Sequence, residues 1–190
     1  MGGRALRRAL LLATVVATLA TGLVACGGGS DSAIDQEGDV RVLNEILARQ
    51  LAAVEAYGEA LPALRGAELA TAREFRSQEQ EHVDATMKTL RGLEGEADPP
   101  AETIEADDLR TRRDAFEFLY ELESATIDDL LSAVGKLTIS WPRPLVASMA
   151  ANQAQRLVLI RRALGAGSLE AIPKAFEAGE TPDPEEMMKK

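Results

Sequence analysis

The sequence predicts an all-α fold, an antiparallel four-helix bundle with one crossover connection. Three observations carry this prediction. Apolar residues recur at intervals of three and four positions over four long segments, which is the spacing of a single helix face. Aromatic residues make up only 4% of the chain, and strand-like alternation is scarce. Two links between the segments are short, whereas the middle one is long enough to cross a bundle.

The N-terminal segment has the three-part order of a bacterial export signal. Arg4, Arg7 and Arg8 precede an apolar stretch over residues 9–25, which ends at Cys26. The stretch contains threonines, is short for a membrane span and is followed by glycines, so cleavage is the better interpretation. Leu23-Val24-Ala25-Cys26 resembles the lipobox of bacterial lipoproteins. The resemblance implies that residues 1–25 are a signal peptide and that Cys26 is lipid-modified.

The expected mature chain is strongly acidic. Without the three N-terminal arginines, 18 basic residues face 31 acidic ones, a formal charge of −13. Such a field repels nucleic acid, so we expect no nucleic-acid partner. Cys26 is the only cysteine, so no disulfide can stabilise the fold. Residues 26–38 are rich in Gly, Ser and Asp and are expected to form a flexible tether to the lipid.

The bundle is expected over residues 39–165, beginning with two helices joined by a short link. The first is predicted from about Asp39 to Leu61, because Pro62 cannot continue a helix. The second must pack antiparallel to it, because the link is short. Their apolar stripes are Leu43, Ile46, Leu47, Val54, Tyr57 and Leu61, and then Ala72, Phe75, Val83, Met87, Leu90 and Leu93.

An acidic, proline-containing connection over residues 94–108 is expected to be solvated and to cross the bundle. A third helix is predicted to begin near Asp107, whose charge suits a helix N-terminus, and to end before Trp141-Pro142-Arg143-Pro144. The fourth helix is predicted over Leu145–Leu164, with Gly165 ending it. Residues 166–190 are expected to be a tail, of which Ile172, Pro173 and Phe176 pack on the bundle.

Each predicted helix carries a polar residue inside its apolar stripe. A polar residue flanked by core residues at i−4 and i+4 must point inward. Buried carboxylates are costly unless a positive charge compensates them, so a cation is expected between the helices. The inward-pointing residues are Gln50, Glu79 with His82 one turn on, Glu123, and Gln153 with Arg156 one turn on.

This pattern resembles the ferritin-like superfamily, and the resemblance covers about residues 39–165. These bundles bind two irons with one Glu from each of two helices and a Glu-x-x-His pair from each of the other two. Glu79-Gln80-Glu81-His82 matches one such pair, and Glu123 falls at the third-helix glutamate. Gln50, seven residues before Tyr57, falls at the first-helix glutamate. The resemblance implies a metal site at Glu79, His82, Glu123 and Gln50.

The sequence departs from the family pattern at half of the ligand positions. Gln50 and Gln153 offer only neutral carbonyl oxygens, and Arg156 offers no lone pair. Two hypotheses follow. In the first, Arg156 replaces the metal charge by pairing with Glu79 or Glu123 in a metal-free bundle, and no cofactor is bound. In the second, one iron or manganese ion is held by Glu79, His82 and Glu123, with Gln50 or water completing the shell.

The sequence favours the first hypothesis, because a guanidinium near a divalent metal is repelled strongly in a low-dielectric core. We therefore expect an extracytoplasmic lipoprotein, anchored to the cell membrane at Cys26, that acts as a scaffold or binding module. The enzyme alternative is an iron-dependent oxidase or other iron-handling protein. One histidine and a lipidated cysteine provide no hydrolytic constellation. A homodimer formed through a helix face remains open.

Overall fold

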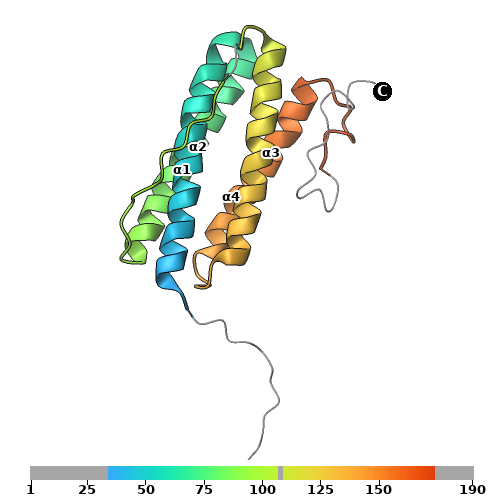
Figure 1. Cartoon of the computed structure of the whole chain (residues 1–190). Helices are drawn as coiled ribbons and strands as arrows, with labels where there is room; N and C mark the ends of the chain where they lie inside the picture. The colour runs from blue at the N-terminus through green and yellow to red at the C-terminus, as the bar shows by residue number, and fades with distance from the viewer. Residues whose placement is uncertain (1–33, 107–108, 174–190) are drawn as a thin grey trace, which may run out of the picture. The chain divides into compact units, whose positions relative to one another are not determined.

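Four long helices make up the fold in the computed structural model, which describes residues 34–106 and 109–173. They are α1 (Gln36–Ala60), α2 (Gly66–Gly92), α3 (Arg112–Lys136) and α4 (Arg143–Ala163), and a 3-10 turn, η1 (Leu61–Ala63), follows α1. These residues contain no strand. α1 and α2 form one antiparallel pair and α3 and α4 the other (Figure 1). The predicted all-α four-helix bundle is confirmed.

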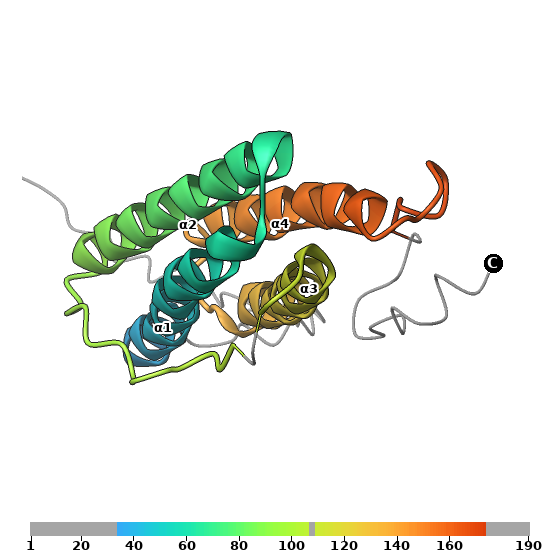
Figure 2. The same ribbon diagram turned by 90° about the horizontal axis from the view of Figure 1, so that it is seen from above.

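The middle connection is the predicted crossover. It returns along the bundle, so that α2 and α3 point in the same direction, and it passes along the outer side of α1 (Figures 1 and 2). The Asn44 side chain on α1 donates a hydrogen bond to the carbonyl of Glu96 at 3.0 Å and accepts one from the amide of Asp98 at 2.9 Å. Arg49 forms an ion pair with Glu102 at 2.8 Å. Side chains of α1 therefore hold this acidic segment on the bundle surface.

Helix starts differ from the sequence-based expectations. α1 begins at Gln36, inside the expected tether, because the Asp35 side chain caps it by accepting from the Gly38 amide. α3 begins at Arg112 rather than near Asp107, which lies outside the described residues. Thr111 and Asp114 form a reciprocal capping box there. The start of α3 is therefore set by this pair of capping hydrogen bonds and not by the acidic residues that precede it.

The fourth helix begins two residues earlier than predicted, at Arg143, with Pro142 as its N-cap. Proline is compatible with a first helical turn because the amides there have no helical partner to lose. At the other end, Gly165 adopts a φ of +105° and terminates the helix, as predicted. The Ala166 amide donates to the Arg161 carbonyl at 3.0 Å, which is the long bond of a Schellman cap.

The expected packing of the tail is only partly correct. Ala171 is fully buried, but Ile172 is 54% exposed and does not pack as predicted. Phe176 lies outside the described residues. A contact that the sequence did not predict ties α1 to the link between α3 and α4. The buried carboxylate of Asp39 accepts hydrogen bonds from the amides of Thr138 and Ile139, both at 2.7 Å.

The core consists of two apolar clusters separated by a polar layer. One cluster, which includes Leu43, Val83, Leu130 and Met149, lies toward the start of α1. The other, which includes Tyr57, Phe75, Leu119 and Ile160, lies toward its end. Along every helix, the inward-pointing polar residues fall between these clusters. None of the helices in the described part of the chain combines the length and hydropathy needed to span a membrane.

Candidate functional site

The polar layer is built from one or two residues of each helix. Every member predicted to point inward, apart from His82, is at most 1% exposed. The helical repeat places each of them between two apolar turns, so burial of those turns carries the polar side chain into the core. The layer comprises Gln50 from α1, Glu79 from α2, Glu123 from α3, and Gln153 and Arg156 from α4.

Arg156 supplies the positive charge of the polar layer. Its Nη1 atom forms a buried salt bridge with Oε1 of Glu79 and lies 3.4 Å from Oε1 of Glu123. Its Nε atom donates to Oε1 of Gln78 at 3.2 Å, and its Cζ atom lies 5.4 Å from the ring centroid of Phe75. The guanidinium is thus held by carboxylates of two helices and by an aromatic face, which suits its planar, delocalised charge.

The two glutamines have separate roles. Nε2 of Gln153 donates to Oε1 of Glu79 at 2.7 Å, so this amide adds a second donor to that carboxylate. Oε1 of Gln50 instead accepts from the hydroxyl of Thr86 at 2.9 Å, and its Nε2 lies 3.3 Å from the sulfur of Met149. Gln50 is therefore engaged with Thr86 rather than with the carboxylates. Thr86 was missed by sequence reasoning, and its only signal is its position seven residues after Glu79.

Tyr57 and Glu123 form a buried hydrogen-bonded pair. The Tyr57 hydroxyl donates to Oε1 of Glu123, and both side chains are at most 1% exposed. Burial raises the pKa of Glu123 to about 7, even though Arg156 opposes this rise. Burial and the Glu123 charge also raise the pKa of Tyr57 well above its usual value. The tyrosine is therefore a fixed, neutral hydrogen-bond donor to this carboxylate.

Glu79 keeps its charge more readily than Glu123. Burial would raise the pKa of Glu79, but the adjacent His82 imidazole and the charge and hydrogen bond of Arg156 outweigh this effect and lower it. Nδ1 of His82 lies 3.5 Å from Oε2 of Glu79, and the His82 side chain is 14% exposed at the edge of the layer. The Glu-x-x-His pair of α2 is thus brought together in space. At neutral pH the layer holds one firmly ionised glutamate opposite one arginine.

The residues present do not fit a centre of two iron ions. Such a centre needs a second Glu-x-x-His pair, and α4 supplies an amide and a guanidinium in its place. The Arg156 guanidinium occupies the space between the Glu79 and Glu123 carboxylates, where its charge would repel a divalent ion. Within the described residues, no group of three or more His, Cys, Asp or Glu side chains is placed to hold a metal ion.

Comparisons with known proteins identify the class to which this bundle belongs. Residues 38–166 match the family described as the ferritin-like domain. The chain therefore belongs to the ferritin-like domain family. Among solved structures, it resembles one from Bacillus anthracis strain Ames, described as ferritin-like, diiron-carboxylate proteins. That match has a TM-score of 0.56 and 18% identity and covers 70% of this chain and 97% of the other, which establishes a shared fold. No match was found among curated proteins.

Proposed function

We propose that this protein is a metal-free ferritin-like scaffold, held outside the cytoplasm by lipid on Cys26. The observation that carries the proposal is the buried Arg156 guanidinium between Glu79 and Glu123. It supplies from the chain itself the positive charge that metal ions supply in a diiron-carboxylate bundle. The buried carboxylates are then neutralised without a metal ion. The function of the protein would lie in its surface, through which it binds other molecules.

The anchoring part of the proposal rests on the sequence, because Cys26 lies outside the described residues. A cysteine bearing more than one acyl chain gives stable membrane attachment, whereas one chain alone is marginal. The chain carries a −13 formal charge after the expected cleavage, so electrostatic attraction to anionic lipid would not retain it. Retention of the protein at a membrane should therefore depend on the lipid.

Metal analysis of protein purified without chelators tests the absence of a metal. We expect substoichiometric iron and manganese in the wild-type protein. A matched variant carrying Gln50→Glu, Gln153→Glu and Arg156→His has all the ligand residues of a two-iron site in the same fold. This variant should bind iron, which shows that the assay can detect a filled site. Stoichiometric metal in the wild-type protein, lost on His82→Ala, would overturn the proposal.

One observation favours a second candidate, a single iron or manganese ion bound by Glu79, His82 and Glu123. Within the described residues, Oε2 of Glu79, Nδ1 of His82 and Oε2 of Glu123 are buried and lack hydrogen-bond partners. Oxygen and imidazole ligands suit both metals. The same metal analysis separates the candidates, because a single site predicts one ion per chain and the scaffold predicts none.

Fractionation of cells that produce the full chain tests the anchor. Wild-type protein should be found with membranes and be released by detergent, but not by high salt, because the attachment is hydrophobic. Cys26→Ser should move the protein to the soluble fraction. Ser30→Ala, in the same glycine-rich segment, is a matched control that should leave it at the membrane. Membrane retention of the Cys26→Ser variant would overturn the lipid assignment.

A further inference from the structure

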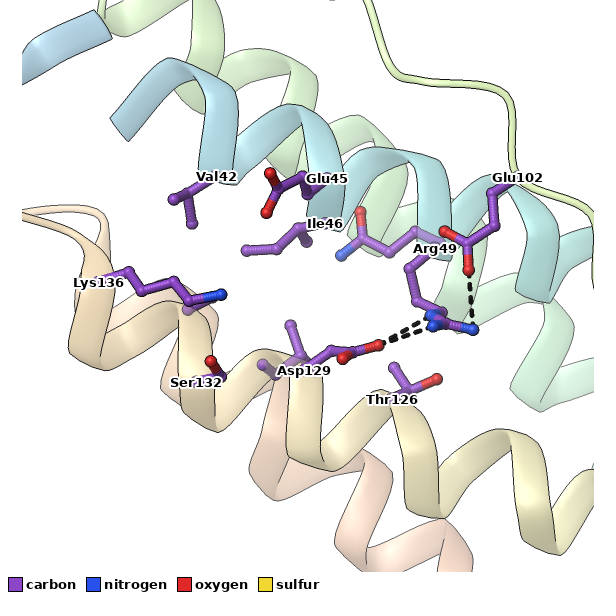
Figure 3. Close-up of a pocket in the computed structure, with 12 residues that line it drawn as sticks. Val42, Glu45, Ile46, Arg49, Glu102, Thr126, Asp129, Ser132 and Lys136 are labelled. Carbon is purple, nitrogen blue, oxygen red and sulfur yellow. Dashed lines mark hydrogen bonds and ion pairs between the residues drawn. The ribbon is translucent and has the colours of Figure 1, made fainter. Parts of the chain in front are cut away.

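A cavity of about 200 Å³ lies between α1 and α3, on the side of the bundle where the crossover passes (Figure 3). Its floor is formed by buried residues, among them Ile46, Leu130, Ala133 and the polar-layer residue Gln50. Its rim is charged, with Arg49 and Glu102 at one end and Lys136 at the other (Figure 3). An apolar floor with a few polar groups around it is the usual construction of a small-molecule site.

The Arg49 end of the cavity is held in place by ion pairs. Nε of Arg49 donates to Asp129 on α3 at 2.9 Å, and Nη1 lies 2.8 Å from Glu102 in the crossover. These contacts join three segments of the chain across one side of the cavity. This wall is therefore preformed, and a ligand would not have to order it on binding.

Two opposite, solvent-exposed charges at the other end have no partner within residues 34–106 and 109–173. Lys136 extends from α3 toward α1, and Glu45 lies on α1 at the same end of the cavity as Val42 (Figure 3). Among the described residues, neither side chain has a hydrogen bond or an ion pair, although both line one cavity. Arg49, by contrast, has two carboxylate partners. A group placed between Lys136 and Glu45 could satisfy both charges at once.

We propose that this cavity binds a small molecule carrying both a carboxylate and an ammonium group, such as an aliphatic amino acid. Lys136 would bind the carboxylate and Glu45 the ammonium, while Val42, Ile46 and Leu130 contact the apolar part. An apolar cavity of about 150 Å³ accepts benzene, so this one suits a molecule of about eight non-hydrogen atoms. L-valine has this size and both charges.

Calorimetric titration of the full chain with three matched probes tests the proposal. L-valine carries both charges, isobutylamine lacks the carboxylate, and isovalerate lacks the ammonium. We expect L-valine to bind and each analogue to bind about tenfold more weakly or not at all, because each loses one charge-assisted hydrogen bond. An equal affinity for valine and either analogue would contradict the assignment of two charged ends.

Variants of the two free charges test the residues. Lys136→Gln and Glu45→Gln should each weaken L-valine binding about tenfold, again by removing one charge-assisted contact. Lys88→Gln on α2 and Glu55→Gln on α1 remove the same charges at exposed positions outside the cavity and should leave binding unchanged. All four positions are exposed, so helicity and the unfolding midpoint should match the wild type. Absence of valine binding at millimolar concentrations, or equal weakening by the control variants, would overturn the proposal.

Discussion

Two arginines in this bundle each contact a pair of carboxylates, but in different environments. Arg49 pairs with Glu102 and Asp129 at the surface, where the three side chains are 28%, 27% and 52% exposed. Arg156 pairs with Glu79 and Glu123 in the core, where all three are 1% exposed. The chemistry is the same in both clusters, so any difference in their behaviour reports the effect of burial.

Burial changes what each partner contributes. At the surface, water solvates a carboxylate that loses its arginine, so the loss is small. In the core, the same loss leaves a charge without solvent or counterion, and the free energy of unfolding falls by several kcal/mol. The buried cluster is therefore not a large net source of stability. It is an arrangement in which no member can be removed alone without penalty.

The largest expected effect is that of Arg156→Ala. We expect the free energy of unfolding to fall by about 3 to 5 kcal/mol, because Glu79 and Glu123 lose their common counterion. Urea denaturation monitored by circular dichroism measures this loss. It should be greater at pH 8 than at pH 6, where protonation of Glu123 relieves part of the repulsion. A loss below about 1 kcal/mol at pH 8 would show that the buried ion pair is not formed.

Replacing the whole buried cluster should have a smaller effect of the opposite sign. Well-packed apolar residues in place of a buried ion pair are often neutral or stabilising by about 1 to 4 kcal/mol. The Tyr57 hydroxyl and the Gln153 amide lose their carboxylate partners and must be replaced as well. The proposed variant carries Tyr57→Phe, Glu79→Met, Glu123→Met, Gln153→Leu and Arg156→Met. Urea denaturation showing a loss comparable to that of Arg156→Ala would mean that the cluster itself stabilises the bundle.

Helical periodicity accounts for what the sequence could predict about the polar layer. The repeat decides which face a residue occupies, and it placed Gln50, Glu79 and Glu123 in the core. It does not decide which buried groups form hydrogen bonds with one another, because that depends on how far each helix is shifted along its axis relative to its neighbours. This axial shift determines two contacts. They are the hydrogen bond between Thr86 and Gln50 and the burial of Asp39 against the backbone amides after α3. The sequence pattern therefore defined the layer and left its pairing open.

Protonation offers a further test of burial, because burial raises the pKa of Glu123 to about 7. Its pKa is raised from 4.5 to about 7 on folding, so the folded state binds more protons than the unfolded state between these values. Stability from this group is complete below pH 4.5 and is lost as the pH rises to about 7. In this range the free energy of unfolding falls by at most about 1.4 kcal/mol per pH unit.

Glu123→Gln should remove this pH dependence, and urea denaturation between about pH 3 and pH 7.5 measures it. Glu79 acts in a different window, because its lowered pKa gives stability that is lost only as the pH falls below 4.5. The Glu123→Gln variant should therefore keep its acid sensitivity and lose its dependence near neutrality. If the free energy of unfolding of the wild type instead rises from pH 5 to 7 and Glu123→Gln abolishes this rise, the pKa of Glu123 is not raised by folding.

The smallest expected effect is that of Arg49→Ala. Exposed ion pairs contribute about 0 to 1 kcal/mol, so the free energy of unfolding should change by no more than this. Added salt should reduce the difference further, because screening acts on exposed charges and hardly on buried ones. The same salt series should leave the Arg156→Ala difference intact. If both differences shrink alike in 1 M NaCl, water reaches the Arg156 cluster, and the contrast between the two arginines is not one of burial.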